Sequence, residues 1–129
     1  MRSKLILAFL LCSPSALVAH GLGPADQVVR VSERASFFSF EVEALNMRKD
    51  VNRFTFSVQD EEGESVPFSS IQRDFTLPSE TSRRMKLFLK NDGRKKYKVC
   101  TWANPIQVAE LTGQKLQSVV CVSLRVQYY

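Results

Sequence analysis

Apolar residues recur at every second position in several segments, and this alternation is the strongest constraint on what the chain can fold into. It runs through residues 38–44, 54–58, 85–89 and 120–128. A β-strand that buries one face and exposes the other has this period of two. Because no helical period is sustained anywhere, the sequence predicts an all-β fold.

Turn signals separate these alternating segments. Pro78-Ser79-Glu80-Thr81 and Asn91-Asp92-Gly93 favour reversals of the chain, and the acidic run at 60–64 ends another segment. Short strands at this spacing are typical of two packed antiparallel sheets. We therefore expect an immunoglobulin-like β-sandwich of about seven strands, formed as a single domain by residues 20–129.

Residues 1–19 have the organisation of a cleavable signal peptide. Arg2 and Lys4 precede the apolar run 5–11, and small residues follow up to Ala19. The apolar stretch 5–18 is shorter than the roughly 20 residues that span a bilayer. We therefore expect export, cleavage after Ala19 with Ser15 or Ala16 as alternative sites, and no integral membrane segment.

The cysteine count changes when the leader is removed. Cleavage would remove Cys12 and leave Cys100 and Cys121, which lie 21 residues apart. In an oxidising compartment such a pair predicts a disulfide. A metal pair is the alternative, but no other Cys and no suitable His lies nearby in the sequence. We expect no metal and no cofactor.

The chain offers little for catalysis. Its single imidazole is His20, which cleavage after Ala19 would place at the amino terminus. A Ser or Cys nucleophile needs a base within reach, so we expect no enzyme activity. We expect His20 to be flexible rather than a copper ligand. We also expect the acidic run 60–64 to be a solvated turn rather than a calcium site.

Eight Lys or Arg residues lie between residues 83 and 98, with Asp92 as the only acid among them. The chain is expected to be exported, so we predict no nucleic-acid binding. One interpretation is a surface that binds an acidic protein or another anionic surface. The other is a solvated face that prevents the edge strands of two copies from pairing.

Five parts of the sequence, read in order, match a known family. They are Arg30 with Asn46 sixteen residues later, and the segments 53–62, 75–87, 96–105 and 116–129. Together they resemble the amino-terminal domain of PapD-like periplasmic pilus (fimbrial) chaperones of the chaperone–usher pathway. The resemblance covers essentially the whole chain after the leader, and it implies an immunoglobulin-like fold and a periplasmic location.

The resemblance also implies a mode of binding. In that family the last strand of the domain completes the fold of a pilus subunit by β-augmentation. Two basic residues anchor the terminal carboxylate of the subunit, and the matching residues here are Arg30 and Arg125. One branch of the family joins its sixth and seventh strands by a disulfide, as Cys100 and Cys121 would. The matching donor-strand residues are Leu116, Val120, Val122 and, by parity, Leu124.

These inferences predict a non-enzymatic chaperone or accessory protein of pilus assembly. Its partners would be pilus or surface protein subunits, with an usher or a second chaperone domain as further partners. A structural pilus or surface subunit is an alternative, indicated by Gly113 and the closing Tyr128-Tyr129. An exported protein-binding domain that uses the basic residues 83–98 is another. A structural interpretation also stays open, in which the alternation in 120–126 only packs the core of the domain.

Overall fold

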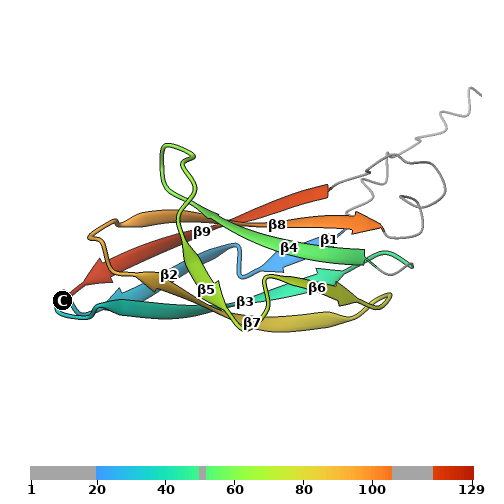
Figure 1. The fold of residues 1–129 in the computed structure, drawn as a ribbon, viewed down its shortest axis with the longest axis horizontal. Coiled ribbons are helices and arrows are strands. Elements are labelled where there is room, and N and C mark those ends of the chain that lie inside the picture. The colour runs from blue at the N-terminus through green and yellow to red at the C-terminus, as the bar shows by residue number, and fades with distance from the viewer. Residues whose placement is uncertain (1–19, 50–51, 106–117) are drawn as a thin grey trace, which may run out of the picture.

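The computed structural model describes residues 20–49, 52–105 and 118–129. These residues form two β-sheets packed face to face (Figure 1). The predicted signal peptide and the predicted donor residue Leu116 lie outside the described residues. Within the described ranges, no helix has the length and apolar character needed to cross a bilayer.

Nine β-strands make up the two sheets. One sheet has the strand order β1-β3-β7-β5 and the other has the order β2-β9-β8-β4-β6. Neighbouring strands are antiparallel, except that β2 runs parallel to β9. The predicted all-β, immunoglobulin-like sandwich is confirmed, with nine strands instead of about seven. The strands are β1 (His20–Gly23), β2 (Asp26–Val31), β3 (Phe37–Asn46), β4 (Asn52–Gln59), β5 (Phe68–Ser70), β6 (Asp74–Leu77), β7 (Ser82–Lys90), β8 (Lys96–Pro105) and β9 (Ser118–Tyr128).

The core lies between the sheets and is built from the alternating side chains. Phe54 of β4 and Leu87 and Leu89 of β7 are fully buried. The rings of Phe54 and Phe75 stack with centroids 5.6 Å apart. Fully burying one such side chain stabilises the fold by about 1.5–3 kcal/mol. The predicted period of two is therefore confirmed in the strands that the sequence identified.

The first strand changes sheets at Pro24. β1 pairs with the end of β3, a cis peptide bond joins Gly23 to Pro24, and β2 then pairs with β9 in the other sheet. The pairing of β2 with β9 begins at Asp26 opposite Ser123. In the described part of the chain, the preceding residues of β9, 118–122, pair only with β8. Among the described residues, no strand is hydrogen-bonded to their other backbone edge, called here the open edge, although β1 of the other sheet lies near the start of β9.

His20 is buried, so the expectation of a flexible terminus was wrong. Its Nδ1 lies 2.7 Å from the Ser118 hydroxyl oxygen, and its Nε2 lies 2.9 Å from the Thr101 hydroxyl oxygen and 3.1 Å from the Thr101 carbonyl oxygen. The His20 and Phe54 rings also pack edge to face, with their centroids 5.4 Å apart. The imidazole thus connects β1 in one sheet to β8 and β9 in the other.

The stability of the fold should depend on the protonation of His20. Burial lowers the pKa of this imidazole below its usual value of 6.5, so the unfolded chain takes up the proton more readily than the folded protein. The free energy of unfolding should therefore fall as the pH drops below about 6.5, by up to about 1.4 kcal/mol per pH unit. Urea unfolding at pH 7.5, 6.5 and 5.5 measures this slope.

His20→Gln is the matched variant for this experiment, because His20 is the only His in the chain. The variant should be less stable at pH 7.5 because the glutamine cannot reproduce all the contacts of the ring. It should also lose most of the stability change between pH 6.5 and 5.5. Equal slopes for the two proteins in that interval would contradict the assignment to His20.

Candidate partner-binding site

The predicted donor residues in β9 occupy different environments. Val122 and Leu124 are 5% and 1% exposed and belong to the core of this chain. Val120 is partly buried and packs against that core from the open edge. In this conformation Val122 and Leu124 have no free surface for a partner. The assignment of donor residues therefore stays a prediction. Of the three described donor residues, Val120 is the most exposed.

The opposite face of β9 carries an apolar residue that the sequence did not single out. Val119 is 45% exposed and lies directly across from Trp102 of β8. The indole N–H of Trp102 donates to the Ser57 hydroxyl at 3.1 Å, which fixes the ring over β4. An exposed apolar side chain on an unpaired strand edge indicates partner binding. This signal can be recognised only when the strand pairing is known, and the sequence alone does not give that pairing.

The predicted disulfide between Cys100 and Cys121 is confirmed. The two residues lie directly opposite each other in β8 and β9, with Cα atoms 4.1 Å apart. Cys121 lies within the open edge, one residue before Val122. The bond therefore ties residues 118–122 covalently to β8, the strand with which they pair.

The predicted anchor residues Arg30 and Arg125 lie on one face of the five-stranded sheet. Arg125 is opposite Val28, and Arg30 is opposite Gln127, so the two arginines are diagonal neighbours on adjacent strands. Both are exposed. The Arg30 guanidinium lies over the Tyr129 ring at 5.3 Å. Neither arginine forms an ion pair with any described residue.

The basic residues between 83 and 98 do not share one face, which corrects the interpretation of a single basic surface. Arg84, Lys86 and Lys90 lie on the outer face of the four-stranded sheet. Lys96 and Lys98 lie on the outer face of the five-stranded sheet. Alternation along each strand, together with the turn between β7 and β8, distributes these charges over two sheets.

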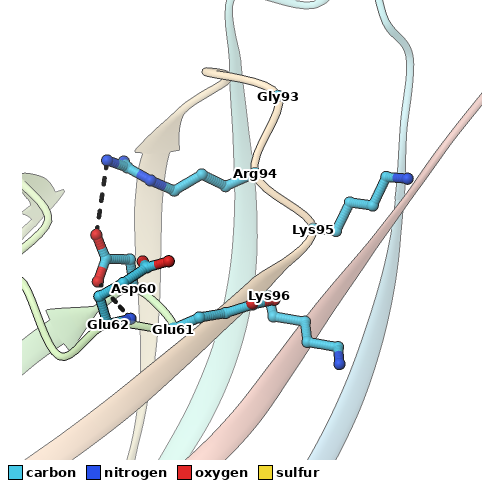
Figure 2. Close-up of a pocket in the computed structure, with 7 residues that line it drawn as sticks. All are labelled: Asp60, Glu61, Glu62, Gly93, Arg94, Lys95 and Lys96. Atoms are coloured by element: carbon cyan, nitrogen blue, oxygen red, sulfur yellow. Dashed lines mark hydrogen bonds and ion pairs between the residues drawn. The ribbon is translucent and has the colours of Figure 1, made fainter.

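The acidic turn and the turn before β8 enclose a cleft of about 360 Å³ (Figure 2). Glu61, Glu62 and Glu64 are exposed, as expected of a solvated turn, but the Asp60 carboxylate is buried, so that expectation was wrong for Asp60. It accepts the backbone N–H groups of Glu62 and Glu64 and lies 3.7 Å from Nη2 of Arg94. The described residues contain no group of three or more His, Cys, Asp or Glu side chains that could hold a metal ion. The residues that line the cleft are Asp60, Glu61, Glu62, Gly93, Arg94, Lys95 and Lys96.

Comparisons with known proteins concern the fold. No protein-family profile and no curated protein sequence matches this chain. The E. coli chaperone DraB superposes with a TM-score of 0.64 and 16% identity, over 84% of this chain and 54% of DraB. A structure of Salmonella enterica SafA pilin in complex with the SafB chaperone gives a TM-score of 0.66 and 15% identity, over 84% of this chain and 54% of the matched one.

The fold is shared more widely than with these chaperones. WR4, a C. elegans MSP family member, superposes with a TM-score of 0.61 and 7% identity, over 84% of this chain and 98% of WR4. This chain spans about half the length of the matched chaperones. The predicted PapD-like immunoglobulin fold is therefore confirmed, and function has to be argued from the site.

Proposed function

We propose that this chain is a non-enzymatic periplasmic chaperone or accessory protein of pilus assembly, which binds pilus or surface protein subunits by strand pairing along β9. The open edge at 118–122 is the observation that carries the proposal. The fold shared with the chaperones DraB and SafB supports it. On the same resemblance, we propose an usher and a second chaperone domain as further partners.

A subunit strand placed along the open edge would form backbone hydrogen bonds with residues 118–122. In this mode the main chain supplies affinity and alternate side chains supply specificity. From Ser123 onwards, β2 occupies this edge of β9, and the Ser123 N–H donates to the Ala25 carbonyl at 2.9 Å. The added strand therefore has to end before Ser123. The end of the subunit strand would then lie close to Arg125.

Arg30 and Arg125 are the proposed anchor for the terminal carboxylate of the subunit. A guanidinium binds a carboxylate through two directional, charge-assisted hydrogen bonds. Because neither arginine is paired with a described acid, no internal ion pair has to break first. Arg30 is also held by its contact with the Tyr129 ring, which reduces the side-chain entropy that binding would cost.

Val120 and Leu116 are the proposed donor side chains. Both have even residue numbers, so their side chains would lie on the same face of an extended strand. Val120 is partly buried at the margin of the core. Val122 and Leu124 continue the same face into the core of this chain. In this proposal those two residues hold β9 in place while the residues before them fill the groove of the partner.

Replacing Arg125 by Gln should not lower the stability of the fold, and it should weaken subunit capture by about 10- to 100-fold, the loss expected for a charge-assisted hydrogen-bonded pair. The test is a pull-down from periplasmic extract with the exported protein, followed by mass spectrometry and by affinity measurement with the retained subunit. Arg84→Gln is the matched control, because Arg84 is an exposed cation on the four-stranded sheet, away from the proposed anchor. It lies opposite Glu43 of β3. Equal retention by both variants would rule out the anchor.

A further inference from the structure

Charges that face each other across strands are complementary on the four-stranded sheet. Glu41 of β3 lies opposite Lys86 of β7, and Glu43 lies opposite Arg84. Directly opposed residues on one face interact, and opposite charges at such positions stabilise the sheet. The fold therefore follows the expected electrostatic pattern on this face.

The five-stranded sheet departs from that pattern. Arg125 of β9 lies directly opposite Lys96 of β8, and both residues are exposed. Arg30 of β2 is the diagonal neighbour of Arg125 on the other side. Three cations thus lie on three adjacent strands. Like charges in direct opposition destabilise a sheet, so this arrangement costs stability unless an anion lies between them.

The acids of the described residues form no ion pair with this cluster. None of the three cations forms an ion pair with any residue in the described ranges. Asp60 and Glu61 line the same cleft as Lys96. The Asp60 carboxylate lies 3.7 Å from Arg94, a pair drawn in Figure 2, and no ion pair between described residues joins Glu61 to Lys96. The charge of the cluster is therefore available to a ligand from outside the chain.

We propose that Lys96 is the third cation of an anion site with Arg30 and Arg125, and that this site binds a chain terminus whose last residue carries a second carboxylate. Adjacent strands are about 4.8 Å apart, so the backbone positions of the three cations span roughly 10 Å across the sheet. A single carboxylate would leave two of the three positive charges uncompensated, whereas the two carboxylates of a terminal Asp or Glu supply a second negative charge. The inference rests on the proposed carboxylate anchor and names its preferred ligand.

Acetate and malonate are the probes, added at low salt to the exported, ¹⁵N-labelled protein and followed by NMR chemical shifts. Malonate should bind at least about threefold more tightly than acetate, the size expected for one more exposed charge pair. Lys96→Gln should remove this preference and leave the acetate affinity unchanged. Lys95→Gln is the matched control, because Lys95 is exposed in the turn before β8.

Two pentapeptides with free carboxyl termini test whether the ligand is a chain terminus. Their sequences are Thr-Val-Thr-Val-Asp and Thr-Val-Thr-Val-Asn. The peptide ending in Asp should bind more tightly to the wild-type protein, and the two should bind Lys96→Gln equally. Equal binding of both peptides to the wild-type protein would overturn the assignment to an acidic terminus.

Thermal unfolding tests Lys96 independently, because Lys96→Gln should weaken the binding of anions but raise the thermal stability of the protein. Lys96→Gln should raise Tm by about 2 °C at low salt because it removes the repulsion with Arg125, and the gain should disappear in 1 M salt. A lysine that only supported the fold would lower Tm when replaced. A lower Tm at low salt would therefore count against the proposal.

The outcomes separate this inference from the proposed function. If malonate shifts the resonances of Arg30 and Arg125 equally in wild type and Lys96→Gln, the inference about Lys96 is wrong and the anchor stands. If neither acetate nor malonate shifts those resonances, the anchor is wrong, and the inference fails with it. Shifts of equal size at Lys86 and Lys90 on the other sheet would indicate unspecific ion binding and would overturn the site.

Discussion

Replacing Leu124 by Ala is expected to lower the free energy of unfolding by about 2–5 kcal/mol, the range for removing a buried leucine side chain. Leu124 lies in the middle of β9, opposite Tyr97 of β8, and its side chain is buried in the shared core. The methyl groups that Ala lacks would leave a cavity between the sheets. Urea unfolding of the purified protein measures the loss.

Val120→Ala is the matched variant for Leu124→Ala, because both residues lie on the same face of the same strand. Val120 is only partly buried at the open edge, so this change should cost about 1 kcal/mol or less. Under the proposed function it should nevertheless weaken subunit capture, whereas Leu124→Ala should act on capture only through stability. Equal stability losses for the two variants would show that the open edge is an ordinary part of the core.

This pair of residues also shows what the sequence could predict about the site. Alternation assigns Val120, Val122 and Leu124 to one face of a strand. It contains no information on whether the core of the same chain or the groove of another chain covers that face. Only the pairing of β2 with β9, which begins at Ser123, separates the covered part of the strand from the open part.

The strands that the sequence identified are long and bury one face, so their period of two is visible. β1 and β5 are four and three residues long, too short for an alternation to stand out. The burial of His20 was missed for a related reason, since its partners Thr101 and Ser118 are 81 and 98 residues away in the chain. The face on which each basic residue lies depends on its position along its strand and on the sheet to which that strand belongs. Neither can be inferred from the clustering of the charges in the sequence.

Reducing the disulfide between Cys100 and Cys121 is expected to lower the free energy of unfolding by about 3 kcal/mol, given their sequence separation of 21. Urea unfolding with and without dithiothreitol measures this loss. Cys121→Ser is the preferred variant, because Cys121 is half-buried whereas Cys100 is buried, and a serine at position 100 would bury a hydroxyl group. The variant should be insensitive to the reductant. Equal stability of the oxidised and reduced proteins would contradict the prediction.

The disulfide should also hold the open edge of β9 in the native state. In the chain-entropy account, a disulfide acts mainly by restricting the unfolded chain and leaves native fluctuations unchanged. Among the described residues, however, 118–122 are hydrogen-bonded to a strand on one side only, so the bond at Cys121 replaces support that a second paired strand would give. We therefore expect reduction to increase amide hydrogen exchange at 118–122 more than at 123–128, where β2 remains paired. A uniform increase along β9 would mean that the bond stabilises the whole domain and does not hold the open edge in particular.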